Sequence, residues 1–294
     1  MSAAIKLVEV GPRDGLQNEK QIVPAAVKLE LIHRLGACGL PVIEATSFVS
    51  PKWVPQLADA AEVMAGLKPV AGVSYPVLVP NEQGLARALA AGAKHIAVFT
   101  AASDAFNRKN INCDIAESLA RIRPVVAQAR EQKLPVRAYV STALGCPYQG
   151  AVPVADVVRV SAALFEMGCE EISLGDTIGI GTPGAARAMF KAVAGAVPVA
   201  QLALHFHDTR GQALANTYAC LEEGARTVDA SVSGLGGCPY ANGASGNLAT
   251  EDLVYMLEGL GLSTGVDLPA LTDTARWISA QLGREPAGKL ARIK

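Results

Sequence analysis

The sequence has little charge and no long apolar run, and each shortage excludes a class of protein. Only 18% of the 294 residues are charged and the formal net charge is −1, so nucleic acid and anionic membranes have no general attraction for the chain. No apolar stretch reaches the length of a membrane span. The N-terminus has neither a signal-peptide core nor an Arg-rich presequence. We therefore expect a soluble cytoplasmic protein, in which any anionic substrate is bound by local groups.

Cysteine is also sparse, and its spacing excludes the usual cysteine-based frameworks. The six cysteines form no CxxC pair and no zinc-finger spacing, which in a chain of this length predicts reduced thiols. Half of the residues are apolar, so the chain can bury a large core. The cysteines are Cys38, Cys113, Cys146, Cys169, Cys220 and Cys238.

What the sequence does have is a regular alternation of short apolar runs and longer segments of helical period. This alternation is typical of a parallel sheet with crossover helices, and eight runs predict an α/β fold of one domain, a single (β/α)8 TIM barrel. We expect the barrel over about 5–262 and a C-terminal helical extension over about 263–294, since no linker or charge block divides the chain. The expected strands are Ile5–Gly11, Val42–Phe48, Val70–Val79, His95–Thr100, Val136–Thr142, Glu171–Gly175, Leu202–Asp208 and Val228–Gly234. The expected helices include Ala25–Ala37, Ile115–Gln132, Ala155–Met167, Gln212–Glu222, Thr250–Leu260 and Leu271–Leu282.

Four glycines support this count of strands and helices. Each ends an expected helix and is followed four residues later by an apolar strand residue, as glycine suits the left-handed position at a helix end. The alternative is an open doubly wound sheet; it is disfavoured because the first strand–helix turn lacks a GxGxxG fingerprint and eight strands close naturally. The pairs are Gly39/Ile43, Gly92/Ile96, Gly168/Ile172 and Gly224/Val228.

Polar residues gather where the expected strands end, which is where such barrels carry their chemistry. His205 and His207 lie two apart on one strand, so both imidazoles should point into the barrel while Phe206 faces the helices. Two imidazoles side by side indicate a divalent metal, and the alternative is a pair of hydrogen-bonded core histidines. Asp14, from the first strand, would add a carboxylate ligand. Mixed imidazole and oxygen ligation suits Mn²⁺ or Mg²⁺ better than the thiolate-rich sets of structural zinc.

Three further charged residues, at the ends of the expected strands or within them, have both a functional and a structural interpretation. Arg13 offers two fixed donors to a developing enolate oxygen, or it forms a surface pair with Asp14. Glu44 lies among apolar neighbours, where an unpaired carboxylate is costly, so we expect a partner such as Arg13. Asp176 either supports the site or caps the next helix.

The stretch Gly234–Gly246 is rich in glycine and contains Cys238, with two glycines before it and a proline after it. We interpret it as a mobile lid with one reactive thiol. A plain flexible loop and a phosphate cradle without a Walker lysine are the alternatives. The other five cysteines are expected to be packing thiols or helix residues.

Five segments, in register over nearly the whole chain, carry a resemblance to a known family. They are Val8–Glu19 (VEVGPRDGLQNE), Ser173–Gly179 (SLGDTIG), His205–Asp208 (HFHD), Ser233–Tyr240 (SGLGGCPY) and Gly243–Leu257. Together they resemble the 3-hydroxy-3-methylglutaryl-coenzyme A lyase family in its bacterial form. The cysteine-bearing glycine loop separates this family from related isopropylmalate and homocitrate synthases and hydroxy-oxo-acid aldolases.

The resemblance implies reverse Claisen cleavage of hydroxymethylglutaryl-CoA to acetyl-CoA and acetoacetate, as in leucine degradation and ketone body formation. It also implies a homo-oligomer, taken to be a dimer, and a Mg²⁺ or Mn²⁺ cofactor. Arg13 would stabilise the enolate and contact the substrate, and Cys238 would act in proton transfer. Asp14, Glu44 and Asp176 would support catalysis, and Lys109 and Asn110 would contact the CoA moiety. The implied metal ligands are Asp14, His205, His207 and Asn247.

The chain departs from the family at two places. Arg210 stands where the family has tyrosine, which puts substrate-tail or loop contacts there in doubt. The region after Leu282 lacks the regulatory cysteine and the peroxisomal tripeptide of animal forms, which favours a bacterial-type protein.

Two other functions are compatible with parts of this pattern. A synthase could run the same chemistry forward with a 2-oxo acid, but the Cys238 loop and the lack of a long regulatory C-terminal domain disfavour it. A non-catalytic metal- or CoA-binding protein is disfavoured because Arg13, Asp14, both histidines and Cys238 are intact. An assay for acetoacetate distinguishes the latter from an enzyme.

Cys238→Ala is expected to lose nearly all turnover and to retain metal and substrate binding, because only proton transfer depends on the thiol. Substrate should protect the wild type against alkylation, and Cys38 or Cys220 variants should stay active. Turnover and binding are measured side by side; near-normal turnover of Cys238→Ala would refute the role and leave the loop as a lid.

Overall fold

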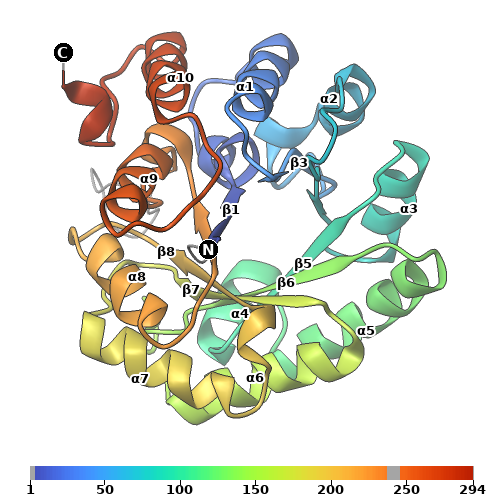
Figure 1. The fold of residues 1–294 in the computed structure, drawn as a ribbon. Helices are drawn as coiled ribbons and strands as arrows, with labels where there is room; N and C mark the ends of the chain where they lie inside the picture. The colour runs from blue at the N-terminus through green and yellow to red at the C-terminus, as the bar shows by residue number, and fades with distance from the viewer. Residues whose placement is uncertain (1–3, 237–245, 294) are drawn as a thin grey trace.

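The computed structural model describes residues 4–236 and 246–293, so Cys238 lies outside the described residues. In the described part, all ladders between the named strands are parallel, and helices surround the sheet as the predicted barrel requires (Figure 1). The strand order is β2-β1-β9-β8-β7-β6-β5-β4-β3. The strands are β1 Lys6–Glu9, β2 Val42–Ile43, β3 Thr46–Ser47, β4 Val77–Leu78, β5 Ile96–Ala101, β6 Val136–Ser141, β7 Glu171–Asp176, β8 Leu202–Phe206 and β9 Thr227–Ala230.

The second expected strand, Val42–Phe48, is divided in two, and this division closes the barrel. Its first half, β2, pairs with β1, and its second half, β3, pairs with β4. Between the halves, the Glu44 amide donates to the Glu9 carbonyl and the Ala45 amide donates to the Pro76 carbonyl. One segment therefore bonds to neighbours on both sides, which leaves no free edge in the described sheet.

The third expected strand was too long, since only β4 remains of Val70–Val79. A turn precedes it, in which the Val73 amide donates to the Val70 carbonyl and Gly72 has a φ of +82°. Pro76 also has no N–H to give to a ladder. Only the end of the run, residues 76–79, is buried, and Val70 is exposed, so the prediction of a continuous strand over Val70–Val79 is wrong.

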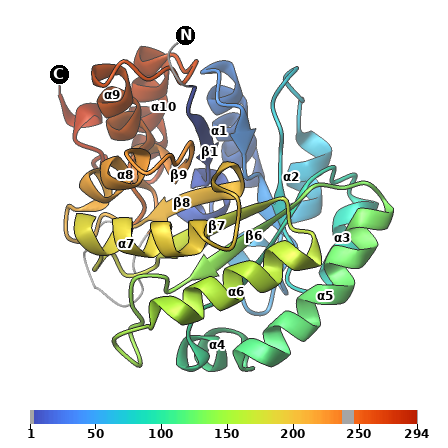
Figure 2. The same cartoon turned by 60° about the horizontal axis from the view of Figure 1, so that its bottom comes forward.

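The helices lie around the sheet, and α5, α6 and α7 run side by side across its outer face (Figure 2). The helix expected over Leu271–Leu282, within the C-terminal extension, forms α10, which packs against α1 and α9. No helix in the described residues has the length and apolar content to cross a membrane. The helices are α1 Ala25–Ala37, α2 Ala60–Gly66, α3 Glu82–Ala90, α4 Asp104–Ile111, α5 Ile115–Glu131, α6 Val154–Met167, α7 Pro183–Ala194, α8 Ala213–Leu221, α9 Thr250–Gly259 and α10 Leu268–Gln281.

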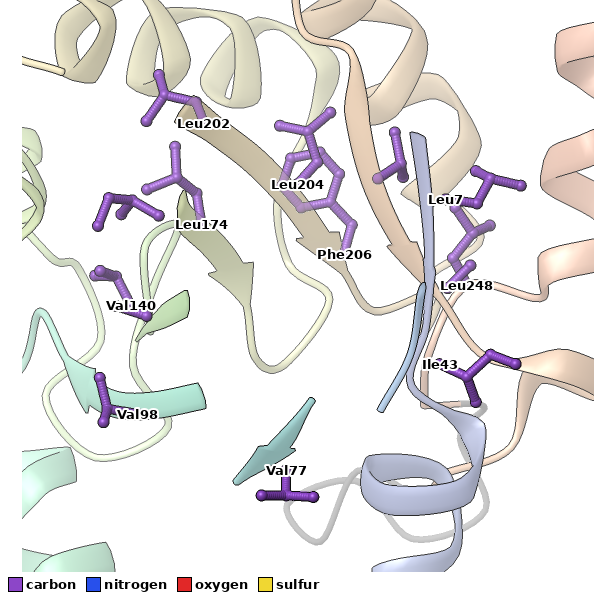
Figure 3. Close-up of a cluster of buried hydrophobic side chains, with 14 of the residues drawn as sticks. Leu7, Ile43, Val77, Val98, Val140, Leu174, Leu202, Leu204, Phe206 and Leu248 are labelled. Atoms are coloured by element: carbon purple, nitrogen blue, oxygen red, sulfur yellow. The ribbon is translucent and has the colours of Figure 1, made fainter. Parts of the chain in front are cut away.

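The strands bury apolar side chains toward the helices and polar ones toward the barrel interior. Leu174, Leu204 and Phe206 join the large apolar cluster that the helices share (Figure 3). Alternate positions on the same strands carry polar residues such as Ser173 and His205, because successive side chains point to opposite faces. The prediction that Phe206 faces the helices is confirmed. The five described cysteines are buried and unpaired by disulfides, as expected.

All four glycines expected at helix ends adopt the left-handed conformation, with φ between +80° and +102°. Two of them differ in their surroundings. A Cβ on Gly39 would lie 2.6 Å from the carbonyl oxygen of Gly265, whereas a Cβ on Gly92 would meet no heavy atom within 4 Å.

Gly39→Ala should therefore destabilise the protein more than Gly92→Ala. Both variants carry the left-handed strain of about 1–2 kcal/mol, but only Gly39→Ala must also displace a backbone carbonyl. Urea unfolding of the two variants beside the wild type measures the difference. Equal losses would show that the carbonyl of Gly265 moves aside freely.

Candidate active site

Arg13 and Asp14 lie on one helical turn, Gly11–Gly15, directly after β1. The turn is held by the Val10 carbonyl, which accepts hydrogen bonds from the amides of Asp14 and Gly15. A Cβ on Gly15 would lie 2.7 Å from side-chain atoms of Leu235 and Ser231, so only glycine lets the turn approach this closely. The strand end thus becomes a rigid platform for the two charged side chains.

Asp14, His205 and His207 converge at the mouth of the barrel, as the sequence predicts. One ligand atom from each lies within 4.8 Å of those from the others, and the two imidazole centroids are 5.5 Å apart. The Nδ1 of His207 is buried with no hydrogen-bond partner among the described residues, which disfavours the alternative of two satisfied core histidines. A carboxylate and two imidazoles are ligand types that a divalent cation accepts. The residues present therefore fit a divalent metal.

The charge states of these groups also suit metal binding. Burial and the neighbouring His205 lower the pKa of His207 to about 4, so this imidazole is neutral at physiological pH. Burial opposes the charged form of Asp14, yet Arg13 and the two histidines lower its pKa to about 2. Metal ligands must be neutral imidazoles and ionised carboxylates, and His207 and Asp14 meet these conditions.

Asn247 lies beside this cluster and is almost completely buried. Its Nδ2 donates to the Asp14 Oδ2 at 2.9 Å and to the Leu235 carbonyl at 3.1 Å. The backbone of Asn247 also bridges to His207. The structure thus brings all four implied ligand residues to one place, with the amide nitrogen of Asn247 directed at Asp14.

Arg13 is a buried cation held by two carboxylates. Its Nε donates to Glu44 Oε2 at 2.7 Å and its Nη1 donates to Asp14 Oδ1 at 2.8 Å. Burial opposes the charge, but Glu44 and Asp14 hold the pKa of Arg13 above its usual range. The expected Arg13–Glu44 pairing is confirmed, and the surface-pair alternative is wrong because Arg13 is only 6% exposed.

The comparisons with known proteins agree with this geometry. The HMGL-like family model matches residues 4–278. The chain is 60% identical over 288 residues to mitochondrial hydroxymethylglutaryl-CoA lyase of Gallus gallus, covering 98% of this chain and 97% of that protein. It is 57% identical to cytoplasmic 3-hydroxy-3-methylglutaryl-CoA lyase of Rattus norvegicus, covering 98% of this chain and 84% of that one.

The chain belongs to the HMGL-like family.

Two solved structures are similar over almost the whole chain. Hydroxymethylglutaryl-CoA lyase from Pseudomonas aeruginosa matches with a TM-score of 0.97 and 54% identity, covering 99% of this chain and 97% of that one. An HMG-CoA lyase from Acinetobacter baumannii, in complex with coenzyme A and 3-methylmalate, matches with a TM-score of 0.94 and 39% identity, covering 99% and 96%. The predicted class of HMGL-like carbon–carbon lyase and the predicted barrel are confirmed.

Asp176 lies on β7 and binds the loop that follows this strand. Its carboxylate accepts hydrogen bonds from the amides of Ile180, at 3.2 Å, and Gly181, at 2.8 Å. Burial raises the pKa of Asp176, although these amides oppose the shift. These contacts resemble the helix-capping interpretation of Asp176, because the loop that it binds leads into α7. Its support of catalysis stays a prediction.

The substrate-contact residues expected from HMGL-like proteins lie on α4. Lys109 and Asn110 are both exposed, and Asn110 lines a pocket of about 380 Å³ together with Gln17 and Trp53. Gln17 also donates to Asp14 Oδ1 at 3.0 Å. The pocket therefore adjoins the candidate metal site, and contact with CoA stays a prediction.

Arg210, at the position where the sequence resemblance implies tyrosine, binds the loop after β7. Its Nη1 donates to the carbonyls of Ile178 at 2.9 Å and Gly179 at 3.1 Å. The departure therefore affects a loop contact, one of the two possibilities raised by the sequence.

Sequence reasoning missed a set of charged residues in the middle of the strands. Asp229 on β9 has its Oδ2 3.1 Å from His205 Nδ1, and it pairs with the buried Arg137 on β6. Burial opposes ionisation, but Arg137 keeps the pKa of Asp229 below its usual range. Polar residues alternate with apolar ones inside these strands, and this pattern could have identified Asp229 and Arg137. A search limited to strand ends does not find them.

Proposed function

We propose that the chain cleaves 3-hydroxy-3-methylglutaryl-CoA to acetyl-CoA and acetoacetate with Mg²⁺ or Mn²⁺ bound by Asp14, His205 and His207. The observation that carries the proposal is the convergence of these three residues beside the buried guanidinium of Arg13. Asn247 is proposed as the fourth protein ligand, since it lies against Asp14. The activities named for relatives 57–60% identical over nearly the whole chain support the substrate.

A divalent metal in this site would lower the pKa of a hydroxyl bound to it and orient that hydroxyl for cleavage. The protein contributes one negative charge from Asp14 and two imidazoles, which add no negative charge. This donor set leaves excess positive charge, which suits an anionic substrate. The carboxyl group of Glu44 is directed away from the cluster, toward Arg13.

Arg13 is placed to stabilise the enolate that forms when the carbon–carbon bond breaks. Glu44 and Asp14 use its Nε and Nη1, and no described residue accepts a hydrogen bond from its Nη2. The guanidinium also lies over the Tyr139 ring, with its central carbon 5.3 Å from the centroid. A fixed cation with a free donor is preorganised for a developing oxyanion.

The remaining assignments follow from the resemblance and the family. We propose that Cys238 returns a proton to the product carbanion and that Lys109 and Asn110 contact the CoA moiety. Glu44 and Asp176 position the groups around them. A homodimer in the cytoplasm is proposed, in line with the cytoplasmic relative.

Treatment with EDTA is expected to abolish acetoacetate formation, and added Mg²⁺ or Mn²⁺ is expected to restore it. The reason is that Asp14 and the two histidines would otherwise face the substrate without a cation. A coupled acetoacetate assay on hydroxymethylglutaryl-CoA measures both arms, and a 2-oxo acid with acetyl-CoA tests the synthase alternative. A fully active preparation that is free of metal would overturn the metal assignment.

Arg13→Gln should lower kcat by several orders of magnitude and change KM little. Loss of one preorganised donor costs about 10²–10³ in rate, and a charged donor costs more. Arg159→Gln, on the exposed face of α6, is the matched control and should behave as the wild type. Normal kcat with a raised KM would make Arg13 a substrate anchor only.

A further inference from the structure

The barrel interior below the candidate metal site contains a continuous set of buried polar side chains. Asp229 is fully buried, and its two oxygens have different partners. Oδ1 accepts a hydrogen bond from Arg137. Oδ2 accepts one from the Ser173 hydroxyl at 2.7 Å and lies 3.1 Å from His205 Nδ1.

Arg137 is itself fixed on three sides. Besides Asp229, its Nε donates to Glu171 at 2.6 Å and its Nη1 donates to the Tyr139 hydroxyl at 2.9 Å. Glu171 in turn pairs with Lys6, which is partly exposed at the opposite mouth of the barrel. The Asp229 carboxylate therefore cannot rotate without breaking contacts to residues of other strands.

The direction of the Asp229–His205 hydrogen bond follows from these partners. Two donors, Arg137 and Ser173, already point at the carboxylate, and an ionised carboxylate has no proton to give. The His205 Nδ1 must therefore be the donor. A neutral imidazole that carries its proton on Nδ1 has its lone pair on Nε2, and Nε2 is the atom 3.9 Å from Asp14 Oδ2.

We propose that Asp229 is a positioning residue that holds His205 in the Nδ1-protonated tautomer, with Nε2 directed at the metal site, and that Arg137 and Ser173 fix Asp229 for this task. The proposal rests on the proposed metal site and adds the residues that orient one of its ligands. Partners of this kind set the ring orientation and basicity of a ligating histidine.

A purely structural role for Asp229, as the counter-charge of Arg137, makes different predictions. In that case Glu171 should matter as much, because it also binds the Arg137 guanidinium. Among the described residues Glu171 pairs with Lys6 and Arg137 and not with His205, so Glu171→Gln is the matched control. Asp229→Asn is the informative variant, because its amide keeps the shape but can turn a donor N–H toward His205.

The first measurement is the tautomer of His205 in metal-free protein, read from long-range ¹H–¹⁵N spectra above the ordinary histidine pKa of about 6.5. The chain has four histidines, so signals can be assigned by substitution. We expect Nδ1–H in the wild type and in Glu171→Gln, and Nε2–H in Asp229→Asn. Nε2–H in the wild type would overturn the proposal.

The second measurement is Mn²⁺ affinity by calorimetry, with thermal melting to check the fold. Asp229→Asn should bind Mn²⁺ about 10-fold to 100-fold more weakly, and Glu171→Gln should stay close to the wild type. Ser173→Ala removes only one bond to Asp229 and gives a smaller loss, which keeps the test valid if Asp229→Asn does not fold. Wild-type affinity in both the Asp229 and the Ser173 variant would overturn the positioning role. If the wild type did not bind Mn²⁺, the proposed metal site would be wrong. The tautomer spectra are recorded without metal, so the two outcomes can be told apart.

Discussion

Pairing of buried charge is the constraint on which the rest of this structure depends. Arg13 and Arg137 both lie inside the barrel, where an unpaired guanidinium would be costly. Each is matched by two carboxylates, Arg13 by Glu44 and Asp14 and Arg137 by Asp229 and Glu171. Tyr139 separates them, with its ring 5.3 Å from one guanidinium and 4.9 Å from the other. The interior is thus an ordered array of charges whose positions limit one another.

The candidate metal site is the solvent-side end of this array. Asp14 serves both Arg13 and the cluster with His205 and His207, so the guanidinium that would stabilise an oxyanion is fixed relative to the cation. Deeper in the barrel, Asp229 makes a similar link, because it contacts both Arg137 and His205. In the proposed reaction, activation of the substrate and stabilisation of the enolate would be coupled through the shared carboxylate of Asp14.

Two further buried carboxylates stabilise the backbone that carries the site. Glu9 accepts hydrogen bonds from the amides of Gly11 and Val232, and Glu251 accepts one from the amide of Ser233. Burial raises their pKa values, to about 7 for Glu9 and about 8 for Glu251, despite these hydrogen bonds. Glu9 joins the Arg13 turn to the segment that leads into the glycine-rich stretch, and Glu251 binds that segment at Ser233. The C-terminal extension packs on the same segment, since the amide of Ala287 donates to the Ser233 carbonyl.

The sequence by itself determined the barrel, the family and the residues of the candidate metal site, because each leaves a local pattern. Apolar alternation marks strands, glycine marks the helix ends, and the spacing of His205 and His207 places both rings on one face. Only the tertiary structure decided how the charges pair. The division of Val42–Phe48 depends on hydrogen bonds to two neighbouring strands, and Asp229 acquires its partners from β6, β7 and β8. The partners of a buried charge are residues distant in sequence, and they come together only when the barrel closes.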